Sequence, residues 1–177
     1  MNSSTIPEKT LRPEAIPPAG LDRRFLLLLL SVAIIALDRL TKWLVETRVE
    51  LGDTITVIPR VFRISHVENQ GAAFSLFNDS SSPARVRWML LAFSILAAVI
   101  VLFFLFKLGR RFGATSLGLA LILGGALGNA YDRWRFGYVV DFLEVHIIHY
   151  HWPDFNVADS AIVVGGILLL LDAMRGS

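Results

Sequence analysis

The chain alternates between long apolar runs and shorter polar connections. Four of the runs are long enough to cross a membrane, and they cover about residues 25–44, 88–106, 114–131 and 157–174. Each run has about 18 to 20 residues, which corresponds to roughly 27–30 Å of helix and matches the hydrocarbon core of a bilayer. The pattern therefore predicts an all-α membrane protein built on four transmembrane helices.

The first apolar run permits a second interpretation. Its last third carries charges, and Arg23 and Arg24 precede it, as in the positive region of a signal peptide. No small-residue cleavage site follows the run. We therefore predict a retained membrane helix rather than a cleaved signal peptide.

The connection after the first helix has a different pattern. Apolar and polar residues alternate over residues 54–67, which is typical of a strand, and the turn-forming stretch 69–71 follows. We predict a small antiparallel sheet within about residues 48–77, and Pro83 suits the first turn of the next helix. The later connection, 132–156, is aromatic and half apolar, as expected at a membrane interface.

Lysines and arginines near the helix ends predict the orientation. Basic residues precede the first helix, fill the turn at 107–111 and follow the last helix at Arg175. We expect these flanks and both termini to face the cytoplasm, with the two long connections on the outer side. Residues 1–22, which contain four prolines and few apolar residues, are expected to be a disordered cytoplasmic tail. Residues 23–177 are expected to form a single four-helix membrane domain.

Composition agrees with a lipid environment and excludes several chemistries. Hydrophobic residues make up 54% of the chain and the mean hydropathy is +0.58, too apolar for an ordinary soluble domain. The absence of cysteine excludes disulfides, a thiol nucleophile and thiolate metal sites. A net charge of +2 gives no indication of nucleic-acid binding. Neither a GxSxG motif nor a glycine-rich phosphate loop is present.

Ionisable side chains at membrane depth are the main candidates for chemistry, because an unpaired charge there costs several kcal/mol. Asp38 could simply pair with Lys42 four residues later. Asp132 and Arg133 could be interfacial charges, and together with Asn129 they share one helix face.

Two further acids lie close to predicted helix four. Asn156 could cap this helix, and Asp159 could interact with its dipole. Asp141, eighteen residues before Asp159, has no local partner of opposite charge.

Asp141 and Asp159 together are suited to acid–base catalysis. Two carboxylates that share a site cannot both ionise easily, so one of them keeps a proton. The ionised member can take a proton from water while the protonated member donates to a carbonyl oxygen, as in aspartic proteases. Because such a pair titrates as a unit, neither residue is given a fixed role.

Two other functions are open to such a chain. A metal-dependent membrane hydrolase would use the cluster of His146, His149 and His151 together with Asp141, but an HExxH motif is absent and interfacial histidines are the simpler interpretation. We predict no metal site and no cofactor. A small transporter subunit would also hold acids in a bundle, but it should show an inverted repeat or a continuous polar path, whereas these acids lie toward one side.

Five short blocks, in one order along the chain, carry a resemblance to a known family. They are DRLTK at 38–42, NQGAAFS at 69–75, GGALGNAYDR at 124–133, VVDF at 139–142 and FNVADS at 155–160. The chain resembles the lipoprotein signal peptidases, or signal peptidases II, which are aspartic peptidases of the bacterial inner membrane. The resemblance spans residues 25–174 and implies four membrane helices, a small extracytoplasmic sheet and an interfacial helix. The motif HIIHYH is not part of the family pattern.

The resemblance also implies a substrate and the role of each matching residue. The substrate would be a prolipoprotein, cut just before its diacylglyceryl-modified cysteine at the outer face of the membrane, with membrane lipids as further partners and a monomeric enzyme. Asp141 and Asp159 match the catalytic pair. The residues expected to bind the substrate or support the pair are Asn69, Gly71, Asn129, Arg133 and Asn156. The residues expected to have a structural or more distant role are Asp38, Lys42, Asp132, Gly125 and Ala158.

Overall fold

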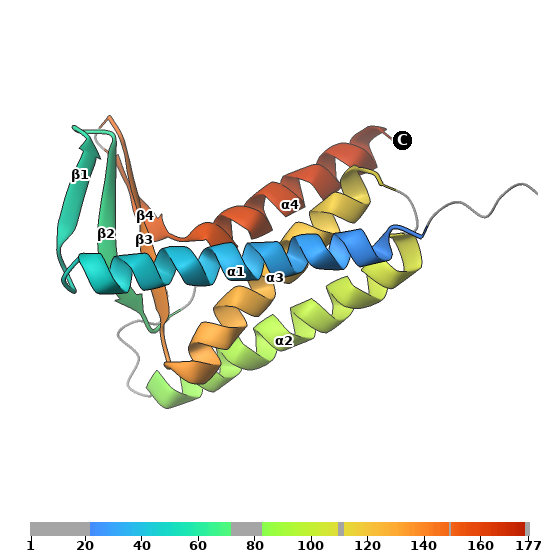
Figure 1. Cartoon of the computed structure of the whole chain (residues 1–177), viewed down its shortest axis with the longest axis horizontal. Helices are drawn as coiled ribbons and strands as arrows, with labels where there is room; N and C mark the ends of the chain where they lie inside the picture. Colours follow the sequence, from blue (N-terminus) through green and yellow to red (C-terminus); the bar gives the residue numbers. More distant parts are fainter. Residues whose placement is uncertain (1–21, 72–82, 110–111, 149, 176–177) are drawn as a thin grey trace, which may run out of the picture.

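The structure, a computed structural model, describes residues 22–71, 83–109, 112–148 and 150–175. The elements along the chain are α1 (Arg24–Arg48), β1 (Thr54–Ile58), β2 (Phe62–Asn69), α2 (Pro83–Leu108), α3 (Ala114–Arg135), β3 (Val139–Ile147), β4 (Tyr150–Phe155) and α4 (Val157–Arg175) (Figure 1). Nearly all of the predicted tail, 1–22, and part of the predicted β region, 72–77, lie outside the described residues.

All four predicted helices are present, and each is somewhat longer than its apolar run. The second helix begins at Pro83, as predicted. The third extends to Arg135 and ends where the backbone N–H groups of Phe136 and Gly137 both donate to the carbonyl of Asp132. Gly137 has a φ of +93°, a conformation that side chains other than glycine rarely adopt, and it turns the chain into β3.

Three of the helices are long and apolar enough to cross a membrane: 84–108, 114–135 and 157–175. The first helix, α1, does not meet the same criterion, because charged residues occupy its C-terminal half. By length and composition, three of the four predicted membrane spans are therefore supported among the described residues, and the count of four is not confirmed. Large apolar side chains such as Phe93, Phe103 and Leu170 are 60–70% exposed and give the bundle an outer surface suited to lipid.

The four strands form one antiparallel sheet in the order β1-β2-β3-β4. Only its first half lies within the predicted β region; the other half comes from residues 139–155, where no strands were expected. The predicted strand at 54–67 is divided in two at Pro59 and Arg60, because proline has no N–H to donate and Arg60 has a φ of +65°. Among the described residues there is no separate interfacial helix.

Helix α3 lies at the centre of the bundle and packs against the other three helices. Glycines allow its backbone to approach α4: a Cβ added to Gly125 would lie 2.3 Å from the carbonyl oxygen of Ala158. One added to Gly118 would lie 2.7 Å from that of Gly165. Close backbone contact of this kind is how small residues join membrane helices.

The sheet lies at one end of the bundle, beside the end of α1 and the start of α4 (Figure 1). The start of α1, the end of α2, the start of α3 and the end of α4 lie at the opposite end (Figure 1). The fold therefore gives the molecule two distinct ends, and polar residues from helices and sheet meet at the first.

Candidate active site

The two predicted catalytic aspartates come from different layers of the fold. Asp141 is the third residue of β3, and Asp159 lies in the first turn of α4. Both line one cleft of about 540 Å³ where the sheet meets the bundle. The cleft is also lined by Asn69, Asn129, Arg133, Val139, Trp152, Pro153, Asp154, Phe155, Ser160, Ile162, Val163 and Val164.

Asn156 connects the two carboxylates. Its side-chain Nδ2 donates to Asp141 Oδ1 at 2.7 Å, and its backbone N–H donates to Asp159 Oδ2 at 3.2 Å. Its Oδ1 accepts from the backbone N–H of Asp159 at 2.9 Å, which is the reciprocal arrangement of a capping box. The helix cap predicted for Asn156 is therefore present, and the same residue also orients the acid on the neighbouring strand.

Two more asparagines complete the hydrogen bonding of the pair. Asn69 Nδ2 donates to Asp141 Oδ2 at 2.8 Å, and Asn129 Nδ2 donates to Asp159 Oδ1 at 2.7 Å. Strand register explains the first contact: Asn69 pairs with Val139, so Asp141 lies diagonally across on the same face. Each of the four carboxylate oxygens thus accepts an N–H.

The environment of Asp141 favours its protonated form. The side chain is 3% exposed, and burial is the main reason that its pKa is raised from 3.8 to about 7. The negative charge of Asp159 raises this pKa further, while the amides of Asn69 and Asn156 and the charge of Lys42 oppose the rise. The carboxyl of Asp141 therefore holds a proton up to neutral pH.

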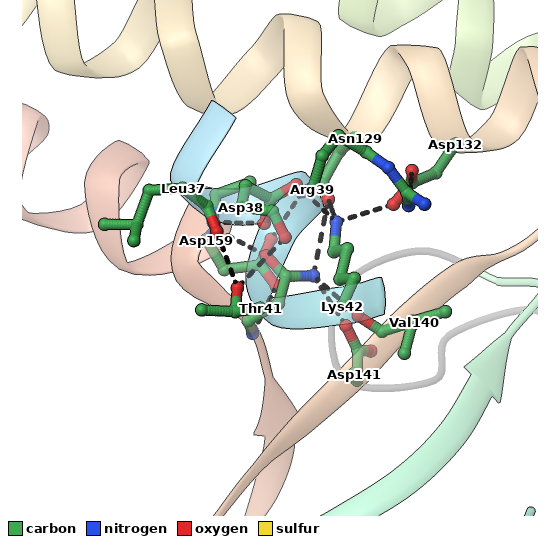
Figure 2. Close-up of polar contacts among 12 residues, drawn as sticks. Leu37, Asp38, Arg39, Thr41, Lys42, Asn129, Asp132, Val140, Asp141 and Asp159 are labelled. Carbon is green, nitrogen blue, oxygen red and sulfur yellow. Dashed lines mark hydrogen bonds and ion pairs between the residues drawn. The ribbon is translucent and has the colours of Figure 1, made fainter. Parts of the chain in front are cut away.

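A buried ion network supports the pair from the side of α1 (Figure 2). The ammonium of Lys42, which is fully buried, lies 2.8 Å from Asp38 Oδ2, 2.6 Å from Asp132 Oδ2 and 3.1 Å from Asn129 Oδ1. Asp38 Oδ1 accepts from the backbone N–H of Ala158 at 3.0 Å. Asp38 therefore does pair with Lys42, and it also holds the start of α4.

The two neighbouring charged residues near the end of α3, Asp132 and Arg133, are buried. Asp132 is fully buried and also pairs with Arg39 at 2.8 Å, so the interpretation of Asp132 as an interfacial charge is wrong. Arg133, 9% exposed, lines the cleft and donates from Nη2 to the carbonyl of Gly71 at 3.1 Å. Its charge faces both Asp141 and Asp159.

The histidine segment lies elsewhere on the sheet. His146 on β3 and His151 on β4 are paired in register, and neither is among the residues that line the cleft. They group with Glu144 rather than with Asp141, contrary to the arrangement that a metal-dependent hydrolase would require. His149 lies outside the described residues.

Three contributors to this region were missed from the sequence. Arg39 pairs with Asp132 and stacks near Tyr131 and Phe136; its place directly after Asp38 was the available signal. Arg87 donates to the carbonyls of Arg133 and Trp134 and so closes the end of α3, which no local pattern indicates. The β4 residues that line the cleft, 152–155, were read only as interfacial.

The protein family and the related proteins that this chain matches are all described as signal peptidases. The family model described as "Signal peptidase (SPase) II" matches residues 30–175. A protein of Solibacter usitatus named lipoprotein signal peptidase is 51% identical over 148 residues, covering 82% of this chain and 88% of that protein. A protein of the same name from Desulforapulum autotrophicum is 44% identical over 144 residues, covering 81% and 88%.

Solved structures extend the similarity to the fold. A bacterial membrane enzyme determined by the in meso method at 2.3 Å resolution has a TM-score of 0.76 at 28% identity, covering 85% of this chain and 88% of the other. A second such structure, at 1.9 Å, has a TM-score of 0.75 at 29% identity, covering 86% and 95%. This chain therefore shares its fold with two solved bacterial membrane enzymes.

Proposed function

Since the chain belongs to the signal peptidase II family, we propose that Asp141 and Asp159 are the catalytic pair with which it removes the signal peptide of prolipoproteins. The observation that supports this assignment is the bridging of both carboxylates by Asn156 in one cleft. Because the family is one of peptidases, the alternative of a small transporter subunit is no longer needed. The position of His146 and His151 outside the cleft lining favours the aspartic mechanism over the histidine-based one.

In this mechanism the raised pKa of Asp141 makes it the acid. A water molecule attacks the carbonyl carbon of the scissile peptide, gives its proton to Asp159, and the carbonyl oxygen takes the proton of Asp141. The C–N bond then breaks as Asp159 returns its proton to the leaving amine, and Asp141 recovers a proton from the hydroxyl group. The products are a signal peptide with a new carboxyl group and a lipoprotein with a free amino group.

The asparagines are positioned to keep this geometry through the cycle. Asn69 donates to Asp141 and Asn129 donates to Asp159, in each case to the carboxylate oxygen that Asn156 does not contact. These bonds keep both carboxylates oriented when no substrate is bound. Arg133 places a positive charge beside both acids, where it can limit the repulsion when both are ionised. Gly71, whose carbonyl accepts from Arg133, links this cation to the sheet.

The substrate class follows from the position of the cleft. We infer that residues 23–177 form one membrane domain in which α1 also spans the bilayer, with its charges paired inside the bundle. The cleft would then open at the outer face of the inner membrane, and both termini would be cytoplasmic. A diacylglyceryl-modified cysteine held by membrane lipid would deliver the scissile bond to this depth. The apolar lining from Ile162, Val163 and Val164 suits such a substrate, and we propose that the enzyme acts as a monomer.

The test is cleavage of a synthetic lipidated propeptide by the purified protein in detergent. Asp141→Asn and Asp159→Asn should each lower kcat by at least about 10²–10⁴-fold, because Asn cannot transfer the proton. The double variant should be little worse than either single variant, because the two residues act as a unit. The unlipidated peptide should be a poor substrate, since each buried acyl methylene contributes roughly 0.8 kcal/mol to partitioning.

Asp53→Asn is the matched control, because Asp53 is an exposed acid in the sheet region and should retain full activity. Near-native turnover by either catalytic variant would refute the assignment of the pair. Equal cleavage of the lipidated and unlipidated peptides would refute the lipoprotein substrate.

A further inference from the structure

The proposed mechanism leaves one cluster of titratable side chains without a role. Glu144 and His146 on β3 and His151 on β4 direct their ligand atoms to one point, and these atoms all lie within 4.8 Å of one another. The Nε2 atoms of His146 and His151 lie 2.7 Å and 3.2 Å from the same oxygen, Glu144 Oε1. Asp154 Oδ1 lies 3.5 Å from His151 Nε2 at the edge of the cluster.

Glu144 is an unusual centre for such a cluster, because its side chain is 95% buried. Oε1 receives both histidines and the guanidinium of Arg63, whereas Oε2 is buried and has no hydrogen-bond partner among the described residues. A buried carboxylate oxygen without a partner carries a desolvation cost that no hydrogen bond offsets. A cation beside Oε2 would remove that cost.

The atoms are of the kind, and at the spacing, that a divalent transition metal requires. Imidazole nitrogen and carboxylate oxygen bind Zn²⁺ at about 2.0–2.2 Å, which places neighbouring ligand atoms of a tetrahedral site about 3.3 Å apart. The two nitrogen–oxygen separations in the cluster, 2.7 Å and 3.2 Å, are somewhat shorter than that value, so side-chain rotations that open the cluster would admit the ion. Two imidazoles in the set disfavour Mg²⁺ and Ca²⁺, which prefer oxygen ligands.

We propose that Glu144, His146 and His151 form a binding site for Zn²⁺ or a chemically similar divalent transition metal, separate from the catalytic pair. No metal site was expected from the sequence, which lacks an HExxH motif. The ligands come from two strands whose pairing was not predicted. Water or Asp154 would complete the coordination.

The guanidinium of Arg63 would compete with a metal ion for the carboxylate of Glu144. This group contacts Glu144 Oε1, so the cluster can also exist as a metal-free hydrogen-bonded group. The side chain of Arg63 is 36% exposed and can move toward solvent when a cation binds. His151 is half exposed, which gives the ion a path to the site.

An ion at this position would join the two strands of the β3–β4 hairpin. His146 and His151 are direct register partners, one on each strand. The same hairpin supplies Asp141 from β3 and cleft-lining residues 152–155 from β4. Metal binding would therefore stiffen one wall of the cleft without taking part in the acid–base chemistry.

The experiment uses the full chain in detergent micelles, stripped with EDTA and titrated with ZnCl₂ by isothermal titration calorimetry, with bound zinc counted by mass spectrometry. We expect one Zn²⁺ per chain. His146→Asn, His151→Asn and Glu144→Gln should each weaken binding by more than the roughly 10–100-fold that loss of an outer-shell partner causes. Glu144→Gln keeps an acceptor for Arg63 and so removes the ligand charge with little change in packing. MgCl₂ should give no binding.

Hydrogen exchange provides the second measurement. Zn²⁺ should slow amide exchange in residues 139–155 of the native protein but not of His151→Asn. Asp141→Asn is the control from the same strand, outside the cluster, and should bind as the native chain does. Thermal unfolding in EDTA should be the same for native and His151→Asn protein, which excludes misfolding as the cause of lost binding.

Because zinc is measured directly, the result does not depend on the peptidase assignment. Absence of stoichiometric zinc in the native protein would overturn the proposal. So would native-like binding by His146→Asn and His151→Asn, or loss of binding by Asp141→Asn alone, which would place the ion in the cleft.

Discussion

At the scale of single residues, one ammonium group organises much of the site. Lys42 donates to Asn129 Oδ1, so the amide of Asn129 must turn its Nδ2 toward Asp159. The same ammonium neutralises Asp38 and Asp132, both fully buried. Removing one partner of such a network typically costs about 3–5 kcal/mol, because the remaining charges are left buried and unpaired. A residue that touches neither carboxylate of the pair thus determines how one of them is held.

The pKa of Asp141 predicts how stability depends on pH. The folded protein keeps this proton to about pH 7, whereas the unfolded chain loses it near 3.8. The folded state therefore binds more protons between these values, and stability should fall as the pH rises from about 4 to about 7, by on the order of 4 kcal/mol. In Asp141→Asn this fall should be largely absent, because the amide does not titrate.

The measurement is thermal unfolding in detergent micelles at several pH values. The quantity compared is the change in stability between about pH 4 and about pH 7. The absolute stability of the variant is not informative, because its amide also alters the hydrogen bonds from Asn69 and Asn156. Asp53→Asn, at an exposed position, should keep the native pH dependence. An unchanged pH profile in Asp141→Asn would show that another group causes the fall.

At the scale of elements, the contact between α3 and α4 determines where the acid of α4 lies. Gly125 packs against the carbonyl of Ala158, one residue before Asp159. The same turn of α4 is held from α1 through the bond from Ala158 N–H to Asp38. Helix packing and the ion network therefore act on the same few backbone atoms.

Gly125→Ala should impair both folding and catalysis. Its new Cβ would lie 2.3 Å from a backbone oxygen that cannot rotate away, so α4 must shift. We expect a loss of about 1–3 kcal/mol in stability from overpacking and about 10²-fold in kcat from displacement of Asp159. Unfolding and cleavage assays on the purified variant provide the two values.

Gly166→Ala is the matched control on α4, because a Cβ there meets no atom within 4 Å. It should keep full activity and gain up to about 1 kcal/mol from helix propensity. Full activity in Gly125→Ala would show that close α3–α4 contact does not position the acid.

At the scale of the whole molecule, the two ends of the bundle differ in character. The end that carries the sheet holds the cleft with the proposed catalytic pair. The other end holds the last turn of α2, which includes Lys107 (Figure 1). If basic flanks face the cytoplasm, the cleft must open on the outer side.

Single-cysteine labelling tests this orientation, and the natural absence of cysteine makes each label unambiguous. Arg60→Cys in the β1–β2 turn and Lys107→Cys at the end of α2 are both at exposed positions, at opposite ends of the molecule. In intact spheroplasts a membrane-impermeant maleimide should label Cys at position 60 only. Position 107 should react after permeabilisation. The reverse pattern would place the cleft in the cytoplasm.

The sequence by itself determined the parts of this protein that depend on local pattern. The lengths of the apolar runs, compared with the thickness of a bilayer, were sufficient to predict the four helices. Pro83 and Asn156 marked the starts of two of them, because helix caps are local features of the sequence. Five motif blocks were sufficient to place Asp141 and Asp159 among the candidates. None of these inferences needed knowledge of which segments meet in space.

Only the tertiary structure decided which of these segments meet. Strands β3 and β4 were not predicted, because strands are stabilised by pairing with segments that can lie far away in the sequence. For example, β3 pairs with β2, and two helices lie between them along the chain. Asp132, which from the sequence could be an interfacial charge, is a buried ion for the same reason, since Lys42 and Arg39 reach it from another helix. The cluster of Glu144, His146 and His151 exists only once the hairpin register is set. Contacts between distant residues carry no periodicity in the sequence, so the arrangement of both sites could be read only from the fold.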